Sequence, residues 1–380
     1  MSKVTLPIYF DYNASTPVHK DVLQAMLPYF SDDFGNASSK HSFGWRSDQA
    51  VENAREMIAS LLNVEKGEIY FTSGATESIN CAVQGIWESY KDFRPHFITV
   101  TTEHSAMLEA FRKIDSQGAE VDFLKVDKDG RVSVDEIEHK IIEGRTCMIS
   151  VMLANNETGV IQDIKGISKI ARLKGALMMS DTTQAIGKID VDIQDLGIDV
   201  ACVSGHKIYG PKGVGVLYLR RKQPRVHLTP IIVGGGHEKG IRAGSLNVPG
   251  IVGLGKACEL VYDELKQREK HFLILRNCLL VRLKGHKEII LLGSKCKLSN
   301  TLFLSLGNRK ASDFIKQNQS KLALSLGSAC DSAHKEGSYV LKEMGYAKEE
   351  IKSSIRLSLG IYNTLDEVEF LADRIIDFYS

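Results

Sequence analysis

Short apolar segments alternate with longer amphipathic segments as far as about residue 250. Seven apolar segments predict strands over Ile69–Thr72, His96–Val100, Val121–Leu124, Met148–Leu153, Leu177–Ser180, Val200–Ser204 and Val214–Leu219. Between them, apolar residues recur at helical spacing and predict helices over Ser47–Leu62, Ile79–Tyr90, Ala106–Gln117, Val134–Glu143 and Ile164–Lys174. Regular alternation of strands and helices is typical of an α/β fold. The sequence therefore predicts a large domain with a mostly parallel, seven-stranded sheet.

The pattern changes after Gly250, where one long helical stretch covers Val252–Lys284. Two short strands follow, Asn300–Leu306 and Leu322–Leu324, and then a terminal helix, Leu365–Tyr379. These elements predict a second, smaller α+β domain, and because chain termini often lie close together we expect the first residues to pack onto it. The predicted boundaries are 14–257 for the large domain, and 1–13 with 258–380 for the small one.

Composition narrows the classes of protein that fit. The chain of 380 residues carries 48 basic and 47 acidic side chains, for a net charge of +1, which argues against direct binding of nucleic acid or an anionic membrane. With 43% hydrophobic residues it has the material for a packed core. No apolar run approaches the ~20 residues of a membrane span, and the N-terminus lacks a signal-peptide pattern. We expect a cytoplasmic protein.

The cysteines are odd in number and carry no CxxC spacing. They stand at positions 81, 147, 202, 258, 278, 296 and 330. A disulfide framework is therefore not expected, and neither is a metal site. Five lie in apolar patterns typical of core positions, and Cys296 lies in a polar turn. Cys330 differs, because it sits among small polar residues near His334, where a thiol can be exposed and reactive, although Asp331 opposes its ionisation.

Three polar segments follow predicted strands of the large domain, at the edge where open α/β sheets bind ligands. Thr72–Ser78, with Ala75 and Thr76, suits an anion at a helix start, although it also suits an ordinary cap. Asp181 can hold a protonated ring nitrogen or cap a turn. Lys207, in Ser204–Gly213, can form a Schiff base with an aldehyde or be a solvated loop lysine.

Together these segments resemble the cysteine desulfurases, in the class V aminotransferase group of fold-type I enzymes that use pyridoxal 5'-phosphate. The resemblance runs along nearly the whole chain as an ordered set of motifs. The motifs are Asp11–Pro17, Gly35–Ser39, His41–Gly44, Thr72–Ser78, Thr102–Ser105, Asn155–Gly159, the Asp181 and Lys207 segments, Gly234–Glu238, Arg242–Ser245, Gly327–Cys330 and Ser354–Gly360.

The resemblance implies a role for each candidate residue around the cofactor ring. Lys207 would form the Schiff base and act as general base, Asp181 would hold the pyridine nitrogen, and Gln184 would hold the ring hydroxyl. His104 would stack on the ring, although a core histidine is the alternative.

Further residues would bind the phosphate and the substrate. The phosphate cup would comprise Ala75, Thr76, Ser204 and His206, and Ser245 would reach the phosphate of the neighbouring subunit, which implies a homodimer. Asn155 and Arg356 would bind the substrate carboxylate, a role that suits a bidentate guanidinium. For Arg356 the alternative is a surface salt bridge, but Ile355 and Leu357 predict a strand around it.

The expected activity is conversion of L-cysteine to L-alanine with a persulfide on Cys330. The sulfur would pass to an acceptor protein for iron–sulfur cluster assembly, tRNA thiolation or DNA phosphorothioation, and the sequence does not choose among them. Alternatives in the same group are a selenocysteine lyase or an aminotransferase. A different class of alternative is a non-catalytic partner or scaffold protein.

Overall fold

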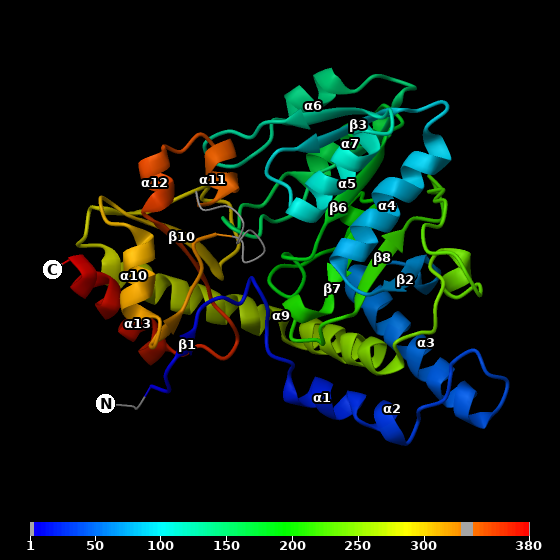
Figure 1. Cartoon of the computed structure of the whole chain (residues 1–380), viewed down its shortest axis with the longest axis horizontal. Helices are drawn as coiled ribbons and strands as arrows, with labels where there is room; N and C mark the ends of the chain where they lie inside the picture. The colour runs from blue at the N-terminus through cyan, green and yellow to red at the C-terminus, as the bar shows by residue number, and fades with distance from the viewer. Residues whose placement is uncertain (1–3, 328–336, 380) are drawn as a thin grey trace.

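The structure is a computed structural model that describes residues 4–327 and 337–379 (Figure 1). Within these residues the largest sheet has seven strands, in the order β2-β8-β7-β6-β5-β3-β4. Only the two pairings that involve β8 are antiparallel. The strands are β2 (Ile69–Thr72), β3 (His96–Val100), β4 (Glu120–Leu124), β5 (Thr146–Ser150), β6 (Leu177–Asp181), β7 (Val200–Ser204) and β8 (Gly215–Leu219). The expected mostly parallel, seven-stranded α/β architecture is confirmed.

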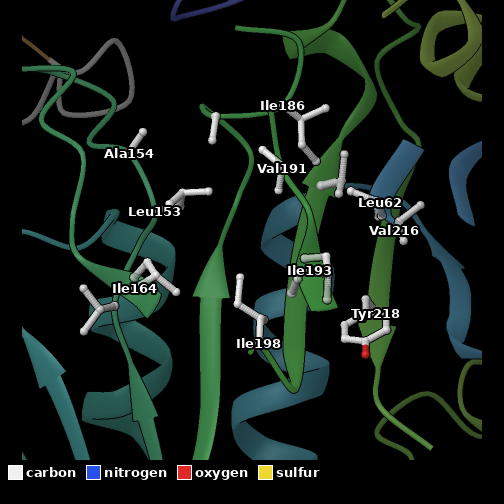
Figure 2. Packing of buried hydrophobic residues seen from close by; sticks show 14 of the residues in the cluster. Leu62, Leu153, Ala154, Ile164, Ile186, Val191, Ile193, Ile198, Val216 and Tyr218 are labelled. Carbon is white, nitrogen blue, oxygen red and sulfur yellow. The ribbon is translucent and has the colours of Figure 1, made fainter. Parts of the chain in front are cut away.

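Helices cover both faces of this sheet. One face packs against α4 (Ala75–Tyr90) and α5 (Ser105–Asp115), and the other against helices that include α3 (Ser42–Leu62) and α7 (Ile164–Leu173). Neighbouring strand residues point to opposite faces, so each strand supplies side chains to both clusters. Figure 2 shows the second face, where side chains of several elements meet. Burial on both faces explains why the strands are continuous apolar runs.

The long helix α9 (Val248–Leu283) belongs to two cores. Its first half packs on the large sheet, and its second half packs on a three-stranded antiparallel sheet in the order β12-β10-β9. The strands of this smaller sheet are β9 (Ile289–Leu291), β10 (Thr301–Leu306) and β12 (Ser354–Ser358). Near the start of the chain, β1 (Ile8–Tyr9) pairs with β11 (Leu322–Ala323). The boundary between residues 257 and 258 stays a prediction, because α9 crosses it without a break.

The remaining helices are short, except α13, and lie at the periphery (Figure 1). They are α1 (Lys20–Met26), α2 (Pro28–Ser31), α6 (Val134–Lys140), α8 (Ile193–Leu196), α10 (Ala311–Asn318), α11 (Tyr339–Glu343), α12 (Lys348–Lys352) and α13 (Leu365–Tyr379). In the described residues no helix is both long enough and apolar enough to cross a bilayer.

Two helices begin earlier than their apolar pattern predicts. The first turn of α4 starts at Ala75 and not at Ile79, because its early residues are polar and carry no periodic signal. In α3 the first turn starts at Ser42, where the Nδ1 of His41 accepts from the backbone N–H of Gly44. Histidine is not among the residues that usually signal a helix start. The early start of α4 matters because it places backbone N–H groups beside the strand ends.

The turn before α4 depends on close contact with the antiparallel strand β8. A Cβ atom on Gly215 of β8 would lie 2.5 Å from the Cα of Gly74 and 2.5 Å from the carbonyl oxygen of Val203. Real side chains do not approach backbone atoms this closely, so only glycine lets the Gly74 turn rest on β8. The turn is thereby fixed at the carboxyl edge of the sheet, beside the end of β7.

We expect Gly215→Ala to lower the free energy of unfolding by about 1–3 kcal/mol, because the added methyl group forces backbone apart. Gly285→Ala is the matched control, since a Cβ there meets nothing within 4 Å. Chemical denaturation of both variants measures the difference. Equal stabilities would contradict the close contact between β8 and the Gly74 turn.

Candidate active site

A cavity of about 350 Å³ opens at the carboxyl edge of the large sheet. Nine of the residues singled out from the sequence line it: Ala75, Thr76, His104, Asp181, Gln184, Ser204, His206, Lys207 and Arg356. Two do not line it, Asn155 and Ser245. Cys330 lies outside the described residues. Of the other cysteines, four expected core positions are buried, Cys278 is half-buried, and Cys296 is exposed as expected.

One end of the cavity is formed by the first turn of α4. Gly74 precedes the helix with a φ of 150°, and a Cβ on it would lie 3.7 Å from the Oγ of Ser204. The first N–H groups of a helix have no acceptor within the helix, and they lie at the positive end of its dipole. With the hydroxyls of Thr76 and Ser204 nearby, this end of the cavity suits a phosphate.

His206 adds a neutral donor to this end. Its Nδ1 lies 3.2 Å from the Oγ of Ser15. Burial lowers the pKa of His206 to about 4, helped by the positive charges of Lys207 and Lys212. The imidazole is therefore uncharged at neutral pH and can donate one N–H. Lys212 lines the same cavity and is exposed to solvent.

The amine of Lys207 is held by the N-terminal segment of the chain. A short 3₁₀ turn, Gly205–Lys207, follows β7 and brings this side chain into the cavity. Its Nζ donates to the carbonyl oxygens of Asn13 and Ala14, each at 2.7 Å. No local sequence pattern indicates that residues 13 and 14 contact Lys207, because they lie far from it along the chain.

Two buried acids, Asp181 at the end of β6 and Glu103 in the turn after β3, follow strands of the large sheet. Asp181 ends β6, lines the cavity, and accepts from the backbone N–H of Thr183 at 2.9 Å. Glu103 is fully buried, and its Oε1 accepts from the N–H of Met152 at 2.5 Å. Burial, with the nearby charge of Asp181, raises the pKa of Glu103 well above its usual value. Burial thus favours the protonated form of Glu103, a feature that no local sequence pattern predicts.

The imidazole of His104 lines the cavity next to these acids. His104 caps α5, and its Nδ1 accepts from the backbone N–H of Ala106 at 3.1 Å. This contact makes Nδ1 an acceptor and leaves Nε2 as the protonated nitrogen of a neutral ring. The ring is thus fixed by its own helix start and is not a side chain of the apolar core.

Arg356 brings the smaller sheet to the cavity. It lies on β12, which confirms the strand expected there, and it is buried. One guanidinium nitrogen contacts Asp11 at 2.6 Å, and another donates to the carbonyl oxygen of Asn156 at 3.2 Å. Among the described residues its Nε has no partner. A buried guanidinium with a spare donor suits a carboxylate ligand.

The side chain of Asn155 closes its own turn, and its expected contact with a ligand stays a prediction. Its Oδ1 accepts from the backbone N–H groups of Glu157 and Thr158, each at 2.9 Å, and its Nδ2 donates to the carbonyl oxygen of Thr102 at 3.0 Å. Its neighbour Asn156 lines the cavity instead. The Oδ1 of Asn156 is buried and has no partner in the described part of the chain. The sequence could not choose between two adjacent asparagines.

Ser245 is exposed and lies outside the lining of this cavity. The segment that carries it is anchored by ion pairs to α3 and α4, two helices that pack on the large sheet. Both carboxylate oxygens of Glu238 accept from the guanidinium of Arg55, at 2.8 and 3.0 Å, and the Nε of Arg242 contacts Glu77 at 2.8 Å. Ser245 is therefore held at the surface and not within reach of its own cavity.

The donor set fits pyridoxal phosphate. The cavity combines a helix start and hydroxyls for a phosphate, a carboxylate and an imidazole for a ring, and a lysine amine for an aldehyde. The unpartnered Oδ1 of Asn156 and Nε of Arg356 leave polar atoms for a ligand beyond the ring.

We expect Lys212→Gln to raise the pKa of His206 part of the way from about 4 toward its ordinary value of 6.5, because one of the charges that lower it is lost. NMR titration of the imidazole measures this pKa. The stabilisation from the neutral His206 is present above pH 6.5 and is lost as the pH falls through about 4. Lys222→Gln, at an exposed lysine that pairs with Glu65, is the control. An unmoved His206 pKa would contradict the placement of Lys212.

Comparison with known proteins agrees with this geometry. The class V aminotransferase family model matches residues 8–371. The cysteine desulfurase IscS of Rickettsia massiliae (strain Mtu5) is 44% identical over 378 residues, which cover 99% of this chain and 92% of that protein. Among solved structures, a NifS-like protein matches with a TM-score of 0.91 and 35% identity over 98% of this chain and 99% of that one. SspA in complex with cysteine matches with a TM-score of 0.83 and 33% identity over 94% and 99%. The chain belongs to the class V aminotransferase family and, within it, to the cysteine desulfurases that use pyridoxal phosphate.

Proposed function

We propose that the protein converts L-cysteine to L-alanine and passes the sulfur, through a persulfide on Cys330, to an acceptor protein. The observation that carries this proposal is one cavity lined by the amine of Lys207, the carboxylate of Asp181 and the guanidinium of Arg356. These groups match the aldehyde, the ring nitrogen and the substrate carboxylate that the reaction requires. The structure of SspA with cysteine supports cysteine as the substrate.

Different residues of the cavity would bind different parts of the cofactor. Ala75, Thr76, Ser204 and His206 would hold the phosphate, and Asp181 would hold the ring nitrogen. His104 would stack on the ring, and Gln184 would contact the ring hydroxyl. When bound, pyridoxal phosphate supplies an electron sink for the charge that develops at the substrate Cα.

Lys207 would move the proton. Its Nζ is held at the cavity wall by two carbonyl oxygens, so the released amine stays close enough to take the Cα proton and to return a proton later. The substrate carboxylate would bind Arg356 and Asn155, and Asn156 lines the same cavity beside them.

Cys330 would take the sulfur. Its thiolate attacks the substrate sulfur, a sulfur–sulfur bond forms, and the carbon–sulfur bond breaks. The electron pair of the broken bond stays on the substrate Cβ, which becomes the methyl group of alanine after protonation. The role of Cys330 rests on its sequence context of small polar residues, because it lies outside the described part of the chain.

The acceptor would be a protein of iron–sulfur cluster assembly, tRNA thiolation or DNA phosphorothioation. The net charge of +1 favours a protein intermediary over direct contact with nucleic acid in the last two cases. Transfer of labelled persulfide sulfur from the enzyme to proteins of a cell extract distinguishes these destinations.

A second copy of the chain would complete the site. Apolar side chains cluster around the start of α3, where Phe34 is 65% and Trp45 63% exposed and the rings of Phe34 and Phe43 lie 5.6 Å apart. An exposed cluster of this kind typically marks an interface. In the homodimer that we propose, Ser245 reaches the phosphate of the neighbouring cavity.

We expect Cys330→Ser to slow alanine formation from L-cysteine by at least ~100-fold, because the covalent sulfur carrier is lost. The absorbance of the bound cofactor near ~410–420 nm should remain, whereas Lys207→Ala should abolish it. Cys296→Ser, at the exposed cysteine, is the control. If Cys330→Ser still produced alanine and sulfide, this result would contradict the desulfurase mechanism and favour another activity of this family.

Replacing Trp45 by Glu should convert the dimer to a monomer, because a buried unpaired carboxylate opposes association. Light scattering coupled to size-exclusion chromatography measures the mass. The control is Leu173→Glu on α7, a site that is 75% exposed and distant in sequence from the cluster. A wild-type chain that is monomeric at micromolar concentration would refute the shared site.

A further inference from the structure

Lys188 is a buried lysine without an acidic partner. Its side chain is 7% exposed, and among the described residues no carboxylate pairs with it. Its Nζ donates instead to two neutral acceptors, the Oδ1 of Asn13 at 3.0 Å and the Oε1 of Gln184. Burial, with the charges of Lys207 and Arg356, lowers the pKa of Lys188 well below its usual value. Burying an amine without a charged partner costs free energy, so a role for Lys188 beyond stability is worth testing.

The contacts of Lys188 determine the orientation of the Gln184 amide. The Nζ of Lys188 donates to the Oε1 of Gln184, and the amine keeps hydrogens for this contact whether or not it is protonated. The carbonyl oxygen of Asn13 is only an acceptor, so the atom that faces it, at 3.0 Å, must be the amide nitrogen. Because that nitrogen carries two hydrogens and Gln184 lines the cavity, the second N–H is left for a ligand.

Asn13 joins the same network to the reactive amine. Its carbonyl oxygen accepts from the Nζ of Lys207 at 2.7 Å as well as from Gln184. Its side chain accepts from Lys188 and donates to the Oγ1 of Thr301 at 2.9 Å. One buried residue therefore links Lys188, Gln184 and Lys207, and Asn13 cannot shift without moving the acceptor of the Lys207 amine.

We propose that Lys188 is a positioning residue, which makes Gln184 present an N–H donor to the ring hydroxyl of pyridoxal phosphate and holds Asn13 against Lys207. The inference rests on the proposed function, because it takes Gln184 as the partner of the ring hydroxyl. Without Lys188, the oxygen of Gln184 loses its donor, and only the contact of its amide nitrogen with Asn13 still opposes a turn of that oxygen toward the ring. An acceptor there repels the negative charge that a donor stabilises.

The test uses the holoenzyme with Lys188→Met, which keeps the length of the side chain and removes its donors. We expect the affinity for pyridoxal phosphate to fall about tenfold, the effect of one lost buried hydrogen bond. The pH midpoint of the visible absorbance change of the cofactor should rise by about one unit, because a ring oxygen without its donor holds the neighbouring proton more tightly.

A matched control separates positioning from general destabilisation. Lys297 is also 7% exposed, and its Nζ donates to the carbonyl oxygen of Leu292 at 2.6 Å, away from the cavity. Lys297→Met should lower thermal stability and leave both the affinity and the absorbance midpoint unchanged. If Lys188→Met resembles Lys297→Met in both readouts, Lys188 has only a structural role and the proposal fails.

Gln184→Met keeps the proposal testable if Lys188→Met does not fold. This variant should raise the absorbance midpoint by a similar amount, and adding Lys188→Met to it should change the midpoint no further. An unchanged midpoint in Gln184→Met would overturn the inference while the wild type still binds the cofactor. A wild type that binds no pyridoxal phosphate would instead refute the proposed function.

Discussion

The carbonyl oxygen of Asn13 is the point at which the two cores of the molecule meet the cavity. It accepts from Lys207 and from Gln184, both of which follow strands of the large sheet. The same residue is held from the other side, since its backbone N–H donates to the Oγ of Ser358 at the end of β12. The carbonyl oxygen of Asn13, which is tied to the small sheet, therefore holds the side chains of Lys207 and Gln184, which follow strands of the large sheet. The cavity exists as a binding site only while the N-terminal segment lies across it.

Burial and neighbouring charges shift the pKa values of the titratable groups in and behind the cavity. Burial and neighbouring cations lower the pKa of His206 to about 4, and burial with the charge of Asp181 raises the pKa of Glu103, so both shifts favour the neutral form. Neutral groups can orient a ligand through hydrogen bonds without adding charge to it. The helix N–H groups and hydroxyls at the end of the cavity formed by α4 do not titrate, so their capacity to donate hydrogen bonds does not change with pH.

The sheet could be predicted from the sequence because each strand is buried on both faces and reads as a continuous apolar run. The start of α4 could not be predicted, since its first turn is polar and lines the cavity instead of the core. Asn155 and Asn156 show a similar limit, because only the fold shows which of two adjacent amides closes the turn. The roles of Asn13 and Lys188 depend on contacts between segments far apart in the chain, which no local pattern carries.

The long helix α9 has a consequence for how this protein can vary. Its first half is part of the core under the large sheet, and its second half is part of the core under the small one. One residue inserted near its middle would rotate everything beyond it by about 100° and advance it by ~1.5 Å, which would take one of the two apolar faces out of contact. We therefore expect changes in chain length to be tolerated in loops and not in α9, because this helix sets the spacing between the small sheet, which carries Arg356, and the large sheet.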